Sequence, residues 1–410
     1  MTVRIAQISC GTEYSGVQKE IYRAAEITGM EIVFPEVDID DFKRAVDVIG
    51  LSPASTGLKV MLARALAIAE GRVEVDGAIV MTCFRCAEGA LVRHTIRRFL
   101  HEKAHIPVIS YSFTERTKAE NLLLRFEALV NMIERRSLLA RKKHEGLTIG
   151  IDSGSTMTKG VVMKDGEILA AHWLPTTEVV ASGLKVYEEL LAKAGISKSQ
   201  VEAIGVTGYG RFILGKELKA NLMQEEITVC SKGASYLGKA QEGDATIIDI
   251  GGADNKAISI HDGIPYSFTV GGVCAGASGR FLEIAAARLG VDLTTFGELA
   301  LRGDPHKIVM NAYCIVFGMH DLVTALASGA KKEDVAAAAC YSVAEQFFEQ
   351  QFQEVEAKEP VLQIGGTSLI KGLIKAFEDT LKMKIIVPPY SQYAGAVGAA
   401  ILSSGMLKSS

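Results

Sequence analysis

The chain has 410 residues, of which 48% are hydrophobic and 22% charged, and its formal net charge at pH 7 is −4. Its length predicts two or three domains, and its composition excludes a disordered or collagen-like chain. The slightly acidic balance argues against a nucleic-acid partner, and no apolar stretch reaches the roughly 18 residues that a membrane-spanning helix requires. Because the first ten residues read as a folded strand rather than a signal peptide, we expect a cytoplasmic protein with no membrane contact.

The first part of the chain alternates short apolar runs with longer stretches of helical apolar spacing. The apolar runs occupy residues 3–10, 31–36, 76–82 and 106–112. This alternation predicts a small α/β domain with a parallel sheet, whose last helix is expected from about Lys118 to Ala140. A polar, basic run then ends in Gly146 and is followed at once by a new apolar strand. We therefore expect one domain over residues 1–145 and a second over 146–410.

In the second part, three apolar strands each run directly into a glycine turn, at Asp152, Asp249 and Gly365. Glycine lets backbone N–H groups approach a phosphate closely, because it has no Cβ and tolerates positive φ. Neighbouring hydroxyls and a Lys add donors and positive charge. One such turn alone is most often an ordinary strand-to-turn junction, whereas three in order, two of them acidic, favour a nucleotide site. The sequence contains no Walker A motif, so it gives no support to a P-loop type of nucleotide site.

These turns supply the candidate residues of an Mg–ATP site. Asp152 and Asp249 are the candidate catalytic carboxylates, of a kind that holds Mg²⁺ through water. The candidate nucleotide-binding residues are Gly154, Ser155, Thr156, Thr158, Lys159, Gly251, Gly252, Asp254, Gly365 and Gly366. The arrangement resembles the actin, Hsp70 and sugar-kinase superfamily. That resemblance implies two duplicated α/β lobes that close on ATP, here preceded by the smaller α/β domain, and carboxylates that organise Mg²⁺ and the attacking water.

The chain has seven cysteines, and an odd number without an export signal disfavours a disulfide framework. Cys274 and Cys314 each precede a run of good helix formers. The positive end of a helix dipole favours a thiolate, so both positions suit a metal or cluster ligand. A four-iron cluster takes four thiolates, which two chains would supply together around a symmetry axis. On spacing alone, burial of both thiols in the core is the more common alternative.

A series of motifs occurs in order within residues 147–405. The motifs occupy residues 150–159, 207–211, 249–254, 274–282, 314–317, 365–366 and 392–400. They resemble the activator family of the 2-hydroxyacyl-CoA dehydratases and benzoyl-CoA reductases. The resemblance implies a homodimer that holds one [4Fe-4S] cluster between its subunits, with Cys274 and Cys314 as the ligands from each. It further implies that ATP hydrolysis drives a low-potential electron into a partner enzyme, and that a ferredoxin- or flavodoxin-like protein is the donor.

Two positions depart from the pattern of this family. Ala253 stands where the family usually has Gln, which bears on how hydrolysis is tuned. Met319 stands where the family usually has an acidic residue, whereas the nearby Asp321 is acidic as expected. The change at Met319 bears on the electrostatics of the cluster or on the partner surface. Neither departure removes a predicted cluster ligand.

The front domain is an unusual addition to an activator. Residues 76–86, 106–113 and 125–129 are similar to the C-terminal α/β half of the dehydratase subunits that activators reduce. The order of the two domains resembles a family of methanogen proteins, which implies an ATP-driven electron donor or activase in methanogen metabolism, with an acceptor that the sequence does not identify.

Three of the cysteines, Cys10, Cys83 and Cys86, lie at predicted strand ends of the front domain. Parallel α/β topology places such strand ends along one edge of a sheet, where ligand sites usually form. Together the three thiols are candidate ligands of a second cluster. A Cys-x-x-Cys redox pair, or plain structural thiols, fits the spacing at least as well.

Two other functions stay open from the residues alone. A small-molecule kinase of the same ATPase fold would use Asp249 as the base that takes a proton from a bound hydroxyl, but it has no use for thiols in front of two helices. A regulatory subunit would use the cluster or the nucleotide only to fix its shape. The acidic residues at two of the turns argue mildly against that role.

Overall fold

The computed structural model describes residues 2–84, 86–271, 278–311 and 314–407. The chain forms two compact units, Met1–Arg136 and Ser137–Ser410. The basic run before residue 147 is held within the second unit, because the buried Lys232 ammonium donates hydrogen bonds to the backbone carbonyls of Leu139 and Arg141. In the described part of the chain, no helix combines the length and the apolar character needed to span a membrane.

The first unit contains a parallel sheet, as the alternation of apolar runs predicted. Its strands are β1 (Val3–Ser9), β2 (Met30–Val33), β3 (Gly77–Cys83) and β4 (Val108–Phe113). Their order in the sheet is β2-β1-β3-β4, and every neighbouring pair is parallel. Because all four strands run the same way, their carboxyl ends lie along one edge.

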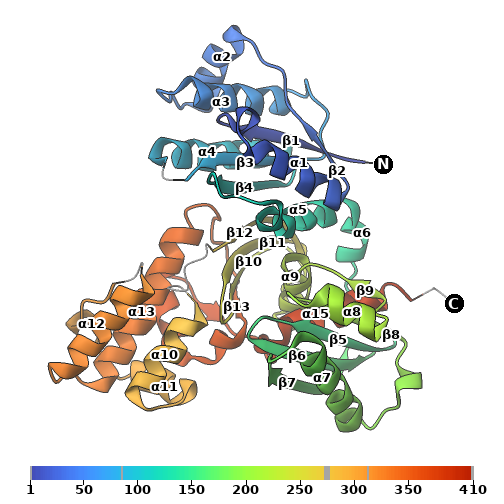
Figure 1. Ribbon diagram of the computed structural model, residues 1–410, viewed down its shortest axis with the longest axis vertical. Helices are drawn as coiled ribbons and strands as arrows, with labels where there is room; N and C mark the ends of the chain where they lie inside the picture. The colour runs from blue at the N-terminus through green and yellow to red at the C-terminus, as the bar shows by residue number, and fades with distance from the viewer. Residues whose placement is uncertain (1, 85, 272–277, 312–313, 408–410) are drawn as a thin grey trace. The chain divides into compact units, whose positions relative to one another are not determined.

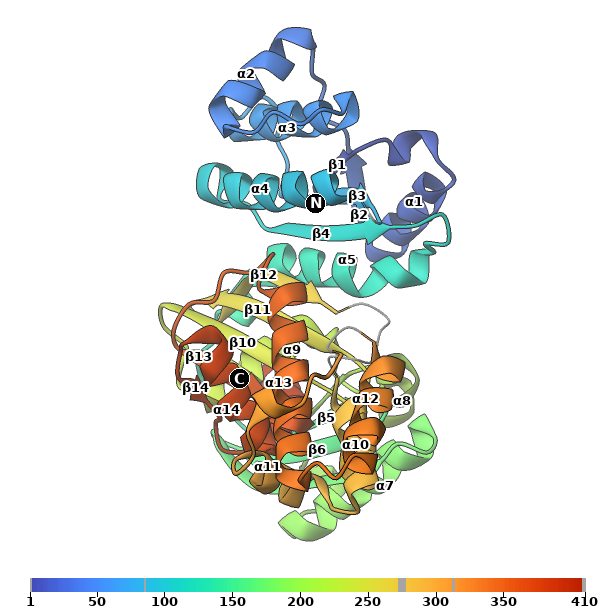
Figure 2. The same ribbon diagram turned by 90° about the vertical axis from the view of Figure 1, so that its left-hand side faces the viewer.

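Helices cover both faces of this sheet. They are α1 (Val17–Thr28), α2 (Ile39–Ile49), α3 (Thr56–Ala69), α4 (Ala87–Ala104) and α5 (Ala119–Glu134). The short α6 (Arg136–Leu139) follows at the boundary, and three of its four residues belong to the second unit. Figure 2 shows α4 and α5 on opposite sides of β4, and α1 packs beside α5. The single helix expected over 118–140 is divided into α5 and α6, because Arg135 leaves the helical conformation at φ −101° and ψ 21°.

The second unit repeats one sheet design twice. The first sheet consists of β5 (Leu147–Ser153), β6 (Met157–Lys164), β7 (Glu167–Pro175), β8 (Ala203–Thr207) and β9 (Leu222–Met223). The second consists of β10 (Asp244–Ile250), β11 (Asn255–His261), β12 (Ile264–Val270), β13 (Val361–Ile364) and β14 (Ile385–Ile386). Their orders, β7-β6-β5-β8-β9 and β12-β11-β10-β13-β14, correspond strand by strand (Figure 1). The predicted duplication into two α/β lobes is confirmed.

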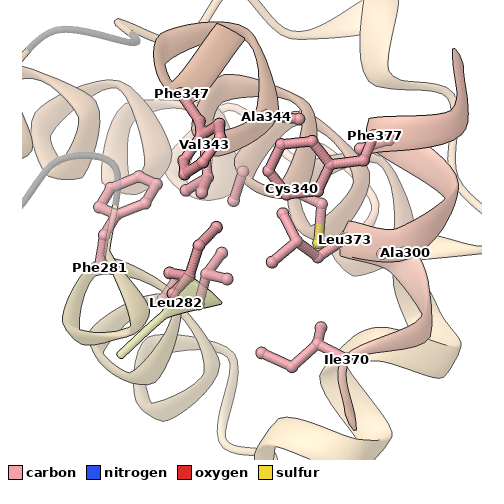
Figure 3. Close-up of a cluster of buried hydrophobic side chains, with 14 of the residues drawn as sticks. Phe281, Leu282, Ala300, Cys340, Val343, Ala344, Phe347, Ile370, Leu373 and Phe377 are labelled. Carbon is pink, nitrogen blue, oxygen red and sulfur yellow. The ribbon is translucent and has the colours of Figure 1, made fainter. Parts of the chain in front are cut away.

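Each lobe has its own helices and apolar core. The first lobe contains α7 (Val179–Ala194), α8 (Arg211–Leu218), α9 (Glu226–Leu237) and α15 (Ala394–Ser404). The second contains α10 (Gly279–Leu289), α11 (Leu293–Ala300), α12 (Ile315–Ala327), α13 (Lys332–Gln351) and α14 (Lys371–Leu381). Figure 3 shows Cys340 of α13 among Phe347, Leu373 and Phe377, so this thiol belongs to the core.

The helix α15 packs directly against backbone atoms of its neighbours. A Cβ on Gly150 of β5 or on Gly233 of α9 would overlap carbonyl groups of α15, and a Cβ on Gly398 of α15 would overlap the Val229 carbonyl of α9. All eleven residues of α15 are buried. Glycine is needed at these positions because a side chain would force the helix away from both neighbours.

We expect Gly398→Ala to destabilise the second unit by about 3 kcal/mol, because the added methyl group meets backbone rather than a movable side chain. The measurement is the urea midpoint followed by a probe in the second unit. Gly366→Ala is the matched control, because a Cβ at that position has no neighbour within 4 Å. Equal midpoints for the two variants would contradict the requirement for glycine.

Candidate functional site

The same acid–lysine pair occurs once in each lobe. Asp152 is the penultimate residue of β5 and lies opposite Lys159 on β6. Asp249 is the penultimate residue of β10 and lies opposite Lys256 on β11. The duplicated sheets therefore present two carboxylates and two ammonium groups from equivalent positions.

A glycine with positive φ also follows the equivalent parallel strand of each lobe. Gly208 follows β8 with φ +89°, and Gly365 follows β13 with φ +85°. A Cβ on Gly208 would lie 2.7 Å from Asp152 Oδ1, and a Cβ on Gly365 would lie 2.7 Å from Asp249 Oδ1. Each carboxylate thus lies directly against the main chain of a turn, because glycine places no side chain between the two.

The glycine turns of the two lobes meet. A Cβ on Gly252, in the turn after β10, would lie 2.7 Å from Thr156 Oγ1 in the turn after β5. Gly395, in the first turn of α15, approaches Asp152 so closely that a Cβ there would lie 2.9 Å from Oδ2. The structure therefore brings Asp152, Thr156 and Gly252 into one site, although they come from different lobes.

Lys256 carries a buried positive charge in this site. Its side chain is 2% exposed, and its Nζ donates a 2.7 Å hydrogen bond to Asp254 Oδ2. Nζ also lies 3.5 Å from Glu226 Oε1 and 3.8 Å from Asp249 Oδ2. Burial by itself would lower the pKa of Lys256, but these carboxylates outweigh burial and hold its pKa well above the usual value. Lys256 therefore stays charged and fixes the acids around it.

The acids of the site differ in how readily they ionise. Burial, with repulsion from neighbouring carboxylates, raises the pKa of Glu226 to about 7 against the attraction of Lys256. Burial also raises the pKa of Asp152, with Lys159 opposing the change and Asp249 adding to it. For Asp254, burial disfavours the charge, but Lys256 overcomes it and lowers the pKa. Glu226 is therefore the carboxyl that changes its protonation near neutral pH.

The remaining predicted residues of the first turn divide into exposed and supporting positions. Ser155 is exposed, and Gly154 and Lys159 are partly buried. Thr158 is buried, and its hydroxyl lies 2.9 Å from that of Thr176, which in turn donates to the Gly154 carbonyl at 2.8 Å. Thr158 thus braces the turn in this structure. In the second lobe, the turn is closed by a 3.0 Å hydrogen bond from the Gly251 N–H to the Asp254 carbonyl, and Gly366 is exposed with open space beside it.

Sequence reasoning missed Lys256, Glu226 and Gly208. Lys256 had a recognisable pattern, because Asp152 precedes Lys159 by the same seven positions that separate Asp249 from Lys256. Gly208 had a weaker one, since it follows a strand as Gly365 does. Glu226 had none, because only the packing of α9 brings this first residue of the helix to Lys256.

Cys314 lies at the start of α12, where a hydrogen bond fixes its backbone. It is the N-cap residue of the helix, and its N–H donates a 2.8 Å hydrogen bond to Asn311 Oδ1. The N–H of Asn311 in turn donates to Asp321 Oδ2 at 2.8 Å, so Asp321 braces the loop that carries the thiol. Met319 packs against the apolar core of the lobe. Cys274, the other predicted cluster ligand, lies outside the described residues.

The helix that follows Cys274 is attached to the second glycine turn. The N–H of Gly279 donates to the Gly251 carbonyl at 2.8 Å, and the N–H of Arg280 donates to the Gly252 carbonyl at 3.1 Å. These are the first two residues of α10, whose N-cap, Ser278, is four positions after Cys274. A movement of the turn is therefore transmitted to the start of α10.

The first unit brings its three cysteines to one edge of its sheet. Cys10 directly follows β1, Cys83 ends β3, and Cys86 is the N-cap of α4. None of the three forms a disulfide. Among the residues that the structure describes, no set of three or more His, Cys, Asp or Glu side chains already has the arrangement of a metal site.

The second unit is similar to known activating ATPases. Residues 149–403 match the model of the BadF/BadG/BcrA/BcrD ATPase family. The (R)-2-hydroxyglutaryl-CoA dehydratase activating ATPase of Acidaminococcus fermentans is 32% identical over 255 residues, 62% of this chain and 95% of that protein. The solved structure of the activator of the 2-hydroxyisocaproyl-CoA dehydratase from Clostridium difficile, with bound ADPNP, is similar with a TM-score of 0.59 and 29% identity. It covers 64% of this chain and 96% of its own, and the likeness confirms the actin/Hsp70-like fold.

The first unit also has a counterpart in a known protein. The uncharacterized protein MJ0800 of Methanocaldococcus jannaschii is 58% identical over 405 residues, which cover 99% of this chain and 98% of that protein. The family match, in contrast, begins only at residue 149. The arrangement of a front unit before the ATPase unit is therefore shared with this relative.

We expect Lys256→Gln to lower the free energy of unfolding by about 3 kcal/mol or more at pH 8, because it leaves buried carboxylates without their counter-charge. The deficit shrinks as the pH falls from 8 towards the pKa that Glu226 has beside Lys256, about 7, because the variant lacks the attraction of Lys256 and protonates Glu226 at a higher pH. Denaturant unfolding at pH 6, 7 and 8 measures it.

Lys142→Gln is the control for this prediction. Lys142 forms an exposed pair with Glu242 at 2.8 Å, so its loss leaves the stability nearly unchanged at every pH. A deficit of the Lys256 variant that did not vary with pH would show that the loss of the counter-charge to Glu226 is not its cause.

Proposed function

Because this chain belongs to the BadF/BadG/BcrA/BcrD ATPase family, we propose that residues 146–410 hydrolyse ATP and thereby drive a low-potential electron from an iron–sulfur cluster into a partner enzyme. The observation that carries the proposal is the meeting of the two glycine turns beside a duplicated pair of carboxylates. Relatives of this family named as activators of dehydratases support the activator role. In this proposal residues 1–145 are a separate front domain.

The residues of the site fit Mg–ATP as the substrate. Gly366 has open space beside its main chain, Gly252 lies against Thr156, and Thr156 and Ser155 add hydroxyl donors for phosphate. Lys159 is the cation for the phosphate charge, because Lys256 is already enclosed by carboxylates. Asp152 and Asp249 would hold Mg²⁺ through water, and the ion would supply charge stabilisation for phosphoryl transfer to water.

Hydrolysis needs an oriented water molecule and a fixed set of charges. In this proposal Asp249 orients the water, while Lys256 keeps Asp249 and Asp254 in place. Attack of the water oxygen forms a bond to the γ-phosphorus as the bond to the ADP oxygen breaks, and a water proton passes to the released phosphate. The residues contribute by positioning and electrostatics, which is how this class of reaction is accelerated.

The attachment of α10 to the glycine turn supports a coupling of ATP to the cysteines. The carbonyls of Gly251 and Gly252 accept the N–H groups of Gly279 and Arg280. A nucleotide that displaces this turn would therefore displace the start of α10 as well. Cys314 starts the neighbouring helix α12, which contacts α10. Two thiolates from each of two chains would complete a [4Fe-4S] cluster, whose contribution is one-electron transfer at low potential.

The partners in the proposal follow from this chemistry. A homodimer supplies the four thiolates, a ferredoxin- or flavodoxin-like protein donates the electron, and an acceptor enzyme receives it. We place the reaction in the cytoplasm and in methanogen metabolism, and the organism of the Methanocaldococcus jannaschii relative supports the methanogen setting alone.

We expect Asp249→Asn to reduce the rate of ATP hydrolysis by about 100-fold or more, because the neutral amide no longer holds the Mg²⁺–water arrangement. Phosphate release from the anaerobically purified protein is the measurement. Asp262→Asn is the matched control, since Asp262 lies in the exposed turn between β11 and β12. Transfer of the phosphate to an added small molecule in place of water would favour a kinase and count against the activator.

A second prediction concerns the shared cluster. In a chain with Cys10, Cys83 and Cys86 replaced by Ser, we expect an anaerobically isolated dimer with about two irons and two sulfides per chain. Adding Cys314→Ser removes half of the thiolate ligands and should abolish the visible absorbance and the iron. Iron that survives this fourth substitution, or an iron-free dimer in which Cys274 and Cys314 are both intact, would rule out the assignment.

A further inference from the structure

The sheet of the first unit changes its direction of winding between β1 and β3. From β1 the chain moves to β2 on one side and then returns to β3 on the other, which gives the order β2-β1-β3-β4. A crevice forms beyond the carboxyl ends of the two strands at such a switch point, and ligands of open α/β sheets bind there. Cys10 follows β1 and Cys83 ends β3, so both cysteines lie at this switch point.

The third thiol comes to the same place from α4. The N–H of Cys86 contacts the Cys83 carbonyl at 3.4 Å, which closes a tight turn between the two residues. The Cys86 Sγ accepts the N–H of Gly89 at 3.2 Å, so this sulfur caps the positive end of an 18-residue helix. A helix end of this kind stabilises negative charge on sulfur.

The Cys83 thiol interacts with each of the other two thiols. Burial raises the pKa of the Cys83 thiol, and interactions with Cys10 and Cys86, hydrogen bonds among them, raise it further. Such hydrogen bonds are typical of protonated thiols. Cys83 is exposed and the other two are partly buried, so the group is open to solvent ligands.

We propose that Cys10, Cys83 and Cys86 form a second, thiolate-ligated metal site in the first unit, with three protein ligands and one coordination position left open. Binding releases three thiol protons and replaces the hydrogen bonds among the sulfurs with metal–sulfur bonds. Soft thiolates select Zn²⁺ or an iron–sulfur cluster. A metal site whose fourth coordination position has no protein ligand can bind an external ligand there, whereas a purely structural metal site has protein ligands at all four positions.

This site does not depend on the proposed function of the second unit, and the test keeps the two apart. The full-length Cys274→Ser/Cys314→Ser chain lacks the ligands of the shared cluster. It is loaded anaerobically with ferrous iron and sulfide in one arm and with Zn²⁺ alone in the other. Unbound metal is removed, and metal, sulfide and free thiols are counted per chain.

We expect retention of about four irons with matching sulfide, or about one Zn²⁺, per chain. Adding Cys83→Ser should lower the retained metal about tenfold or more. Ser112→Ala, at the same sheet edge on β4, is the matched control and should keep the metal, since it removes no soft ligand. Thermal unfolding shows whether the Cys83→Ser chain is folded.

Absence of metal in both arms would overturn the proposal. So would equal retention with and without Cys83 in a folded chain. A disulfide between Cys83 and Cys86 as the only product, with no bound metal, would assign the pair to thiol redox chemistry instead.

Discussion

The backbone-to-backbone packing of α15 is the constraint on which the ATPase unit depends. This helix follows the second sheet in the chain, yet it packs into the first lobe against β5 and α9. Glycine at positions 150, 233 and 398 makes the approach feasible. Because Gly395 then lies against Asp152, α15 forms one wall of the candidate site beside the end of β5. The two lobes thus meet at the candidate site itself.

The charges of the site have a definite balance. Four acids, Asp152, Asp249, Asp254 and Glu226, face the two cations Lys159 and Lys256, so the described site has an excess of negative charge when all are ionised. Such an excess suits a divalent cation better than a bare phosphate. Mg²⁺ would therefore be required before the phosphates of ATP could approach, which is consistent with an Mg–ATP substrate.

Much of the fold was predictable because its signals are local. Apolar runs identified the strands of the first unit, and a strand followed by a glycine turn identified both Asp152 and Asp249. The break at Arg135 had no local signal. The role of Lys256 was not predicted, because a Lys in an apolar strand reads as an exposed residue until the partners that bury it are known. Glu226 reaches the site only through tertiary packing. The position of Cys314 before a helix was predicted correctly. The hydrogen bond from Asn311 to Asp321 was not, because it forms only once that helix has folded.

The hydrogen bonds from the start of α10 to the glycine turn run between main-chain atoms. Side chains at positions 251 to 253 take no part in the bonds from the N–H groups of Gly279 and Arg280. A substitution at position 253, where this chain has Ala, therefore leaves these main-chain bonds in place. A substitution at Gly279 does not, because a Cβ there would lie 2.9 Å from the Gly251 carbonyl oxygen. The attachment of α10 is thus indifferent to the side chain at position 253 but sensitive to the first residue of the helix.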